Sequence, residues 1–519
     1  EDGGEAGLHP SNIHDNAYAV GTLDLTGDQS ILLGPDGPSL GGFVCSVTTA
    51  KGEMWKLGQL HPGDKVHFRL LDLDQAKEIR EAEEANLRHE YQEVVLPEQK
   101  DLDYHYAILA EETAAGTKIV ARLDGEDNIL VEYGEMELDI AIRFRVHVLM
   151  QELKKKDLPV IDLTPGIRSL QIHFDIGKIS LKEMLAAVLE TNRTLPELSD
   201  VTVPSRIIWL PLSWDDPQTQ LAAKRYQQTV RPNAPWCPSN PEFIRRINGL
   251  DSIEDVKKIV FDADYLVLGL GDVYLGAPVA TPVDPRHRMV TTKYNPARPW
   301  TPENAVGIGG AYLCVYGMEG PGGYQFVGRT IQMWNPLKET EYFKHGKPWL
   351  LDFFDQIRFY PVSAEEILKD REDFLRGRFK IKIEETSFNL GKYEQFLKEH
   401  EDTIRAFKDH QEASFEAERK MWKEKGLDEF DSETQDAPAI VEETVPDGCE
   451  AARTNIPGSV WKVLVEDGQK VREGDTLVIL ESMKMEFPVT AEYSGIIEKV
   501  YLKPGEQVNS GQLAASIRV

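Results

Sequence analysis

The chain has 519 residues, enough for three or four domains, and 41% of them are hydrophobic, which supports real buried cores. Its formal charge of −29 at pH 7 argues against nucleic acid or an anionic membrane surface as a partner. No uninterrupted apolar run is long enough to span a bilayer. Four scattered cysteines, without metal-ligand spacing or a secretory framework, predict a reducing, cytoplasmic compartment.

The first part of the chain predicts β-structure followed by a helix and a hairpin. Short apolar runs, the last of them Val66-His67-Phe68, alternate with glycine and proline turns over residues 1–71. A charged, helix-forming stretch covers 74–89. Strands on either side of Asp124-Gly125 predict a hairpin. The chain begins at Glu1 within a glycine-rich segment, and we expect it to be a piece of a longer polypeptide.

The middle of the chain alternates between helices and strands. Ser180 and Glu183 have the spacing of a capping box at the start of a helix. The predicted helices cover 138–155, 181–190, 218–230, 241–247 and 253–261, with a hairpin over 160–175 and a strand over 206–212. This α/β part is followed by a glycine-rich β region from Tyr265 to Trp334.

Three further segments lead to the C-terminal part. Residues 348–361 predict a connecting strand or extended arm, and 393–425 predict a long helix of mixed charge, interpreted as a solvated or interdomain spacer. The acidic stretch 429–443 has few large apolar groups and no periodicity, which predicts a flexible linker. Such a tether suits a domain that must visit separate active sites.

An internal repeat surrounds Lys484. Each glycine of the first half has a counterpart 37 residues later: Gly458 and Gly495, Gly468 and Gly505, Gly474 and Gly511. Each half is too small to bury a core alone, so two like β-units must pack together. Lys484 lies midway between the two outermost glycines, at the connection of the halves, which predicts an exposed turn near a pseudo-twofold axis.

This repeat resembles the biotinyl/lipoyl carrier domain. The triplet Met483-Lys484-Met485 indicates the biotin branch, because lipoyl carriers usually lack both methionines. An ordinary surface lysine on a hairpin is the alternative for a lone lysine, but the repeat and the triplet together favour Lys484 as a biotin attachment site.

An irregular N-terminal segment concentrates polar groups that could carry chemistry. His9, Asn12, His14 and Asp15 lie within seven residues, among glycines and prolines, and catalytic groups concentrate on such loops. A metal site is an alternative, although this is not a usual zinc spacing and no thiol joins it; no metal is expected. A purely structural turn is the other alternative.

A second cluster combines basic side chains with glycines. It contains Arg286-His287-Arg288 and Lys293-Tyr294-Asn295, which suit an oxyanion or carboxylate site. Charged rim residues with structural glycines are the alternative. Gly269-Leu270-Gly271 superficially suggests a dinucleotide loop, but the third glycine and following helix are missing, and no phosphate-binding P-loop motif is present.

The motifs His9-Pro-Ser-Asn-Ile-His-Asp15, Leu33-Gly-Pro-Asp-Gly-Pro-Ser-Leu-Gly-Gly42, Pro-Gly-Gly-Tyr and Val-Gly-Arg-Thr, followed by the carrier, resemble the carboxyltransferase and carrier end of urea carboxylase, including the form in fused urea amidolyase. The resemblance implies cyclophilin-like β-barrels, a small α/β subdomain, a long helix and a C-terminal flattened β-barrel. The expected domains are 1–115 (the C-terminal part of an allophanate-hydrolase-subunit-2-like domain), 116–345 (subunit-1-like), 346–428 (arm and long helix), 429–447 (linker) and 448–519 (carrier).

The resemblance also implies a reaction: a urea nitrogen takes the carboxyl group of carboxybiotin, held on Lys484, to give allophanate in urea degradation. Substrate recognition is expected on His9–Asp15, and the biotin or carboxylate side on Arg286-His287-Arg288 and Lys293-Tyr294-Asn295. ATP, Mg²⁺ and bicarbonate would be used by a biotin carboxylase domain absent from this chain. A biotin protein ligase and a downstream allophanate hydrolase are further expected partners, and a homo-oligomer is left open.

Three alternatives remain at this point. Guanidine is an alternative acceptor, but Asn12 is an amide where a carboxylate would suit that cation, so urea is favoured, with Asp15 as the weakness of the argument. A non-catalytic subunit-1-like module that binds a kinase would not need a biotinylated arm. Transfer to a keto acid is associated with metal-containing TIM barrels, and eight βα repeats are not evident here.

Overall fold

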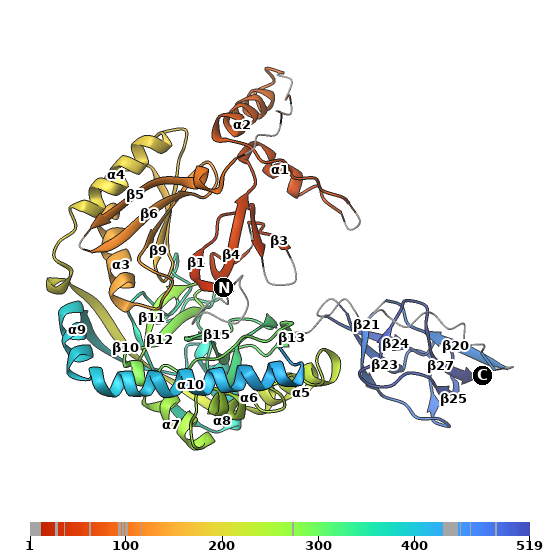
Figure 1. Cartoon of the computed structure of the whole chain (residues 1–519). Coiled ribbons are helices and arrows are strands. Elements are labelled where there is room, and N and C mark those ends of the chain that lie inside the picture. The colour runs from red at the N-terminus through yellow and green to blue at the C-terminus, as the bar shows by residue number, and fades with distance from the viewer. Residues whose placement is uncertain are drawn as a thin grey trace.

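The computed structural model describes residues 12–519 except 26–29, 36, 62–63, 92–94, 96–97, 99–101, 115, 272–274, 429–444, 447, 457 and 483–484. The linker predicted over 429–443 and the expected biotinylated lysine therefore lie outside the described residues. The described chain is mainly β-structure with α/β parts, as predicted, and its carrier lies to one side of the body (Figure 1). Within this part of the chain, no helix is both long enough and apolar enough to cross a membrane.

The first unit is a four-stranded antiparallel sheet in the order β1-β4-β2-β3. Its strands are β1 (Asn12–Ala17), β2 (Thr22–Leu25), β3 (Ser30–Leu32) and β4 (Leu40–Thr48). A 3-10 turn (Lys51–Glu53), α1 (Met54–Leu57) and α2 (Leu73–Leu87) follow, and α2 confirms the helix predicted there. The prediction of β-structure was wrong around Val66 and Phe68, because no strand pairs with this described stretch and both side chains are about half exposed.

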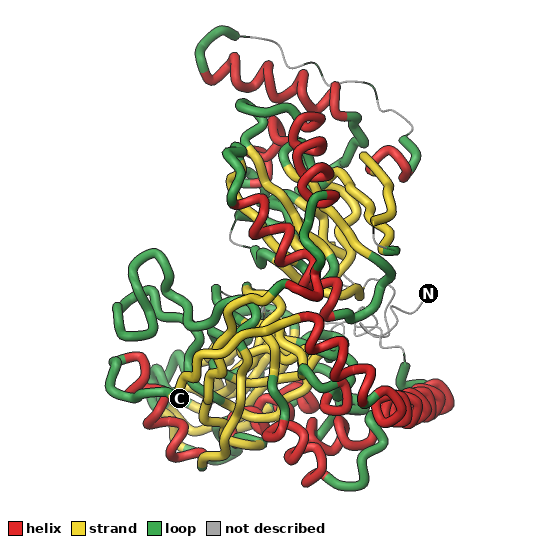
Figure 2. Tube along the Cα trace, turned by 90° about the vertical axis from the view of Figure 1, so that its left-hand side faces the viewer, coloured by secondary structure: helices red, strands yellow, loops and turns green. Residues whose placement is uncertain are grey.

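The second unit is a five-stranded antiparallel sheet in the order β5-β6-β7-β9-β8. Its strands are β5 (Ile108–Ala114), β6 (Thr117–Leu123), β7 (Asn128–Tyr133), β8 (Val160–Pro165) and β9 (Ser169–Phe174). Helices α3 (Ile140–Lys154) and α4 (Leu181–Arg193) share one apolar core with the sheet. The predicted hairpins are confirmed, and Ser180 and Glu183 form the predicted capping box. Figure 2 shows this unit as a lobe above the rest of the body.

The third unit is a closed barrel of seven strands. The hydrogen-bonded order is β17-β14-β15-β12-β11-β18-β10, and pairing of β10 with β17 closes the ring, while β19 extends it outside β10. Its strands are β10 (Thr202–Trp214), β11 (Tyr265–Leu270), β12 (Pro278–Pro282), β14 (Ala305–Gly309), β15 (Tyr312–Val315), β17 (Gln325–Arg329), β18 (Gln356–Val362) and β19 (Lys382–Asn389). Helices α5 (Pro217–Thr229), α6 (Asn240–Ile247), α7 (Ile253–Asp262) and α8 (Ala364–Leu375) and the ribbon of β13 (Arg298–Thr301) and β16 (Gly320–Gly322) complete this unit.

Two predictions for the end of the body were wrong. Residues 348–361 do contain a strand, as one of the two alternatives predicted, but it is not a connecting one, because β18 is inserted in the barrel and pairs with β10 in parallel. The predicted long helix is two helices, α9 (Leu390–Glu399) and α10 (Glu401–Lys425), and α10 is not a free spacer. Its Trp422 is buried and stacks on Phe243 of α6. The mixed charge of α10 indicated a solvated helix, but this contact packs it against the body.

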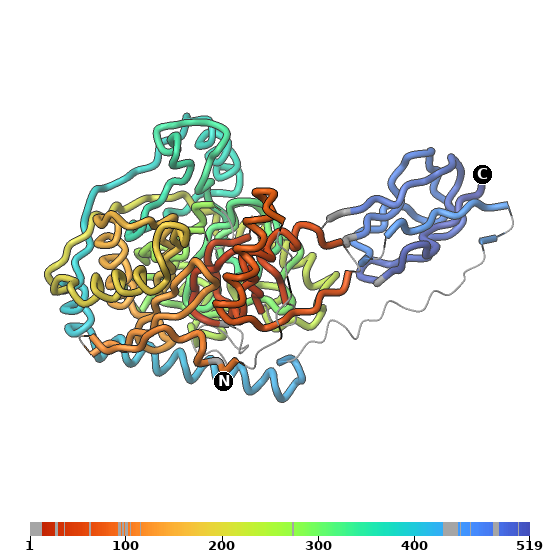
Figure 3. Tube along the Cα trace, turned by 90° about the horizontal axis from the view of Figure 1, so that it is seen from above, coloured from red at the N-terminus to blue at the C-terminus, as the bar shows by residue number. Residues whose placement is uncertain are grey.

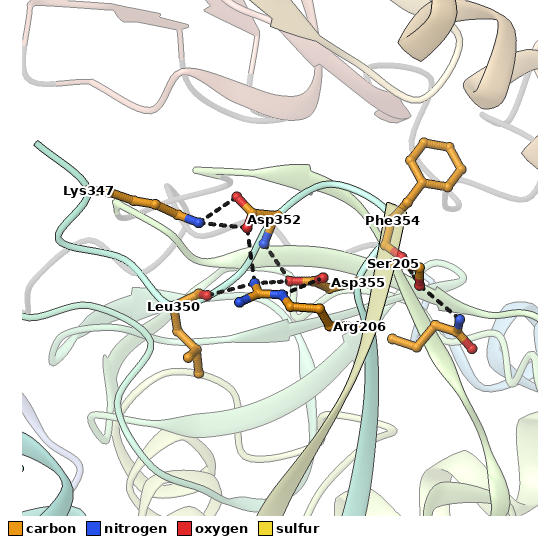
Figure 4. Close-up of polar contacts among 8 residues, drawn as sticks. Ser205, Arg206, Lys347, Leu350, Asp352, Phe354 and Asp355 are labelled. Carbon is orange, nitrogen blue, oxygen red and sulfur yellow. Dashed lines mark hydrogen bonds and ion pairs between the residues drawn. The ribbon is translucent and has the colours of Figure 1, made fainter. Parts of the chain in front are cut away.

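A polar network fastens β10 to the loop before β18 (Figure 4). Arg206 donates to both carboxylate oxygens of Asp355, to the Leu350 carbonyl oxygen and lies 3.1 Å from Asp352. Asp355 is only 2% exposed, and burial raises the pKa of its carboxyl, an effect that Arg206 only partly offsets. Lys347 makes a more exposed ion pair with Asp352.

We expect Arg206→Met to loosen this side of the barrel. The substitution leaves the buried Asp355 carboxylate without its cation, at a cost of about 3 kcal/mol. Native-state hydrogen exchange of the β10 and β18 amides should report that loss as lower protection. The matched control is Lys347→Ala, which removes an exposed pair of about 0.5 kcal/mol. Equal protection in both variants would contradict the assigned role of Arg206.

The C-terminal carrier consists of two four-stranded sheets related by the predicted repeat. One has the order β20-β27-β25-β22, and the other, β24-β23-β21-β26, is its counterpart with each strand shifted by 37 residues along the chain. The strands are β20 (Cys449–Arg453), β21 (Gly458–Val463), β22 (Lys470–Val471), β23 (Thr476–Ser482), β24 (Met485–Thr490), β25 (Gly495–Val500), β26 (Gln507–Val508) and β27 (Leu513–Arg518). The two sheets share one apolar core, which confirms that the halves pack together.

Candidate functional site

Residues 12–15 of the N-terminal motif lie in β1, which contacts both the five-stranded sheet and the barrel. We call these two units the lobes of the body. His9 lies outside the described residues, and Asn12 is described only through its backbone, which pairs with Phe43 of β4. His14 and Asp15 are almost completely buried, with 1% and 2% of their surfaces exposed. The prediction of an irregular loop was therefore wrong for residues 12–17, although polar side chains are indeed gathered there.

Contacts from both lobes hold β1 in place. The Ile167 amide, in the turn between β8 and β9, donates to the Asp15 carbonyl oxygen at 2.8 Å. On the barrel side, His14 Nδ1 lies 2.5 Å from the Tyr312 hydroxyl of β15. Burial and nearby Arg168 lower the pKa of His14 to about 4. The imidazole is therefore neutral at pH 7, and it is suited to positioning β1 rather than to donating a proton as a cation.

The glycine pair at the start of β4 makes room for three functional groups. A Cβ on Gly41 would lie 2.5 Å from the Tyr18 hydroxyl oxygen, and this oxygen accepts a hydrogen bond from the Phe43 amide. A Cβ on Gly42 would lie 2.8 Å from Asp15 Oδ1 and 3.0 Å from Lys293 Nζ. Glycine is thus required here by close approach of side chains, and the Asp15 carboxylate and the Lys293 ammonium both border the same glycine.

Lys293 extends from the barrel towards the first sheet. Its Nζ lies 4.5 Å from the ring centroid of Phe43 and 5.8 Å from that of Tyr324. Within the described chain, no side chain or carbonyl makes a hydrogen bond or ion pair with this ammonium. An amine with aromatic neighbours and unused donors is suited to binding an anion or a developing negative charge.

Asp24 of β2 supplies a second buried carboxylate in this region. It is 4% exposed, and burial raises the pKa of its carboxyl to about 6, with Lys293 acting in the opposite direction. The pKa of the Tyr18 hydroxyl is raised by burial first, then by Asp24, and more weakly by Asp15. Both carboxylates border β4, because Asp24 lies opposite Cys45 in the β2–β4 pairing and Asp15 lies beside Gly42. We call Asp15, Tyr18, Asp24 and Lys293 the junction site, because two sheets and the barrel meet there.

A cavity borders the junction site at Tyr18, and Asp15, Asp24 and Lys293 are not among its lining residues. It has a volume of about 400 Å³, lies between the first sheet and the five-stranded sheet, and has Tyr18, Ser39 and Gln171 among its lining residues. A cavity of about 440 Å³ elsewhere is lined by residues that include Arg145 and Asn192 and by none of the predicted site residues. We place the functional site at the junction because charge, burial and the predicted motif coincide there.

The basic segment around residue 287 lies between the barrel and the terminal helices. Arg286 makes a double hydrogen bond with Asp284 and also reaches Thr403 of α10. Arg288 donates to the Tyr393 hydroxyl of α9 at 2.9 Å. His287 is the last residue of the short 3-10 helix Pro285–His287. The observed contacts of the two arginines fasten α9 and α10 to the barrel; the expected catalytic role of this segment stays a prediction.

Tyr294 and Asn295 also have structural contacts. The Tyr294 hydroxyl exchanges hydrogen bonds with Asn240 in a buried aromatic cluster. The Asn295 carbonyl oxygen accepts from Arg231 at 2.8 Å. Of the second predicted cluster, Lys293 is the residue that the structure brings next to Asp15. The prediction of catalytic roles for Tyr294 and Asn295 remains untested.

The carrier strands on either side of the predicted biotin attachment site pair with each other. Strands β23 and β24 form an antiparallel pair in which Ser482 is opposite Met485. Met483 and Lys484 connect these two positions and lie outside the described residues, and the Met485 side chain is not described either. Positive φ angles of +83° at Gly468 and +88° at Gly505 confirm that the repeated glycines serve equivalent left-handed turns.

Family models match three segments of the chain. Residues 2–70 match the carboxyltransferase domain, subdomain A and B, and residues 119–343 match the carboxyltransferase domain, subdomain C and D. Residues 444–517 match a family described as biotin-requiring enzyme. These segments include both sides of the junction site and the carrier repeat.

Two known proteins are similar to the chain over nearly its whole length, and a third is similar to its carrier. Urea amidolyase from Lachancea kluyveri is 38% identical over 527 aligned residues, which cover 100% of this chain and 28% of that protein. The crystal structure of Kluyveromyces lactis urea carboxylase is 38% identical with a TM-score of 0.85, over 99% of this chain and 45% of that one. A biotin/lipoyl attachment protein from Bacillus subtilis is 46% identical over 56 residues, 11% of this chain and 77% of that protein. The chain thus spans less than half the length of this urea amidolyase and of this urea carboxylase.

Proposed function

The chain belongs to the urea carboxylase family, of which it carries the carboxyltransferase and biotin carrier parts, and from this premise we propose that it transfers a carboxyl group from carrier-bound biotin to a nitrogen of urea, giving allophanate. The observation that carries this proposal is the Lys293 ammonium, which lies beside the buried Asp15 carboxylate at the junction of three units. The names of the relatives and the amide side chain of Asn12 support urea as the acceptor.

The carrier fits covalent biotin. Its two matching halves share one core, and Lys484 is the single lysine between the paired strand residues Ser482 and Met485. Lys484 would hold the biotin through an amide on its side-chain nitrogen. When bound, the biotin supplies a carboxyl group that can be transferred. In the full-length protein, a biotin carboxylase domain using ATP, Mg²⁺ and bicarbonate would load it, after a biotin protein ligase has attached it.

Urea needs help from the protein because its nitrogen lone pairs are delocalised into the carbonyl group. A competent site must orient the molecule, remove a proton from the attacking nitrogen and stabilise negative charge that develops on oxygen. The junction site contains groups for each task. Asp15 can accept hydrogen bonds from the urea NH₂ groups, Lys293 can stabilise the oxygen, and Asp24 can take the proton.

Asp24 is the best-matched proton acceptor of these groups. A general base works best when its pKa is close to the working pH, and burial brings the pKa of Asp24 to about 6. The neutral His14 imidazole holds β1 and the Tyr18 hydroxyl holds β4 through the Phe43 amide. Both are therefore positioning residues in this proposal, and Arg286 and Arg288 take no part in it.

The pH dependence of carboxyl transfer tests this function. Because the Asp24 carboxyl must be deprotonated to act, we expect the single-turnover rate to fall about tenfold per pH unit below about pH 6 and to be level above about pH 7. Rapid-quench measurement of urea-dependent transfer from the loaded holoenzyme would show this. Asp24→Asn should lower the rate and remove the dependence, whereas a wild-type profile that stays level down to about pH 5 would contradict the role of Asp24.

A further inference from the structure

A tryptophan on the outside of the carrier is covered by the body. Trp461 follows Val460 in β21, at an irregularity in the pairing with β23, where Val460 is opposite Leu480 and Lys462 is opposite Ile479. Val460 belongs to the carrier core, whereas Trp461 does not. Trp461 is nevertheless only 5% exposed. The side chain of Trp461 is therefore buried by residues outside the carrier core. Helix α5 of the body contacts β21.

Arg225 of α5 lies between two indole rings. Its guanidinium carbon is 4.3 Å from the ring centroid of Trp461 and 4.7 Å from that of Trp300 on β13. One indole belongs to the carrier and the other to the body, so the arginine bridges them. A planar guanidinium can stack on both faces at once, which a lysine ammonium cannot do. The carrier also approaches α5 at Gly505, where a Cβ would lie 2.8 Å from the Gln228 carbonyl oxygen.

The contact involves strands that lead, on the carrier, to the predicted biotin attachment site and, on the body, to Lys293 of the junction site. On the carrier, Ser459 of β21 pairs with Glu481, which lies three residues before Lys484 in the sequence. On the body, β13 pairs with β16 through Arg298 and Gly322. The next residue, Gly323, would place a Cβ 3.3 Å from the Lys293 Cβ. Figure 3 shows the carrier at one end of the molecule, with the docked end facing the body.

We propose that Arg225, placed between Trp300 and Trp461, is a docking latch that seats the carrier on α5. This inference rests on the proposed function for its purpose, but the docking itself is a property of the described chain. A contact of two stacked rings and one arginine is strong enough to bias the position of a tethered domain and weak enough to release it, as a carrier with two destinations requires.

Hydrogen exchange on the biotin-loaded full chain tests the latch without any measurement of activity. We expect Arg225→Ala to increase exchange about tenfold in 458–463, the change that corresponds to about 1.4 kcal/mol of docking free energy. Lys224→Ala is the matched control, because it removes the same charge from the exposed neighbouring position of α5. Unchanged exchange in Arg225→Ala, or an equal increase in the control, would overturn the proposal.

A double-mutant cycle identifies the partner of Arg225. Trp461→Ala alone should increase exchange in α5, and adding Arg225→Ala should produce little further effect, because both substitutions break the same contact. Arg225→Lys should restore less protection than the wild type has, since it keeps charge without the planar stack. Complete labelling of each variant by biotin ligase shows that its carrier is folded. Additive effects of the two alanine substitutions would contradict the latch.

Activity then separates this inference from the proposed function. With the latch weakened, carboxyl transfer to urea should slow about tenfold at unchanged loading of the biotin. A wild-type chain that docks its carrier but carboxylates no urea would overturn the proposed function and leave the latch standing. Normal transfer to urea together with unchanged exchange in Arg225→Ala would overturn the latch and leave the proposed function standing.

Discussion

Lys484→Arg is expected to remove the covalent biotin and, with it, all carboxyl transfer to urea. Biotin ligase forms an amide with a primary amine, and arginine keeps the positive charge but has no amine that can be acylated under these conditions. Intact-mass analysis after co-expression with a biotin ligase should show one biotin on the wild-type chain and none on the variant. This is the largest effect that we expect from any single substitution in the chain.

The carrier offers a matched control for that experiment. Lys462→Arg and Lys499→Arg change exposed lysines on strands β21 and β25, which are related by the internal repeat. Both should be labelled as fully as the wild type. Labelling that survives Lys484→Arg, or that disappears in either control, would show that biotin is attached elsewhere or that the carrier turn is not what the ligase recognises.

Lys293→Met should have the second-largest effect. Methionine nearly preserves the length and the contacts with Phe43 and Tyr324 but removes the charge. Loss of a group that stabilises developing negative charge typically lowers kcat by about 10²–10³-fold. We expect that loss in kcat, with full biotinylation and with a smaller change in the KM for urea. Steady-state kinetics of the full-length enzyme measures both.

The pH profile of the same variant gives an independent check. Lys293 lowers the pKa of Asp24 against the effect of burial, so removing it should move the acid limb of the residual activity above pH 6. Lys178→Met is a suitable control, because it neutralises an exposed lysine in the turn before α4. Unchanged kcat in Lys293→Met would remove the observation on which the proposed function rests.

The sequence was most informative where its pattern is local. The repeat predicted two equivalent halves because glycines spaced 37 residues apart mark the same turns, as at Gly468 and Gly505. Periodicity and capping predicted α3 and α4 well. The family resemblance predicted a barrel, but local patterns could not predict its strand order, because its closure depends on β10 pairing with β17 and β18, which lie more than a hundred residues away. No local pattern encodes such contacts.

The site was predictable only in part for the same reason. His14 and Asp15 attracted attention because polar groups are dense in their segment. Asp24 was missed, since a single carboxylate in an alternating strand normally indicates a solvated face, whereas this carboxylate is only 4% exposed. In the second cluster, the arginines drew more attention than Lys293. The one usable signal was Gly41-Gly42, a pair in a strand that indicates close approach of other groups.

Identification of the carboxylated product tests the central claim most directly. The biotin-loaded chain would be mixed with a separate biotin carboxylase, ATP, Mg²⁺ and ¹³C-bicarbonate, with urea and guanidine present at equal concentrations, and the products followed by ¹³C NMR. The account predicts labelled allophanate that depends on urea and on Lys484, with little carboxylated guanidine. Label that accumulates on the carrier without reaching urea, or that passes preferentially to guanidine, would contradict it.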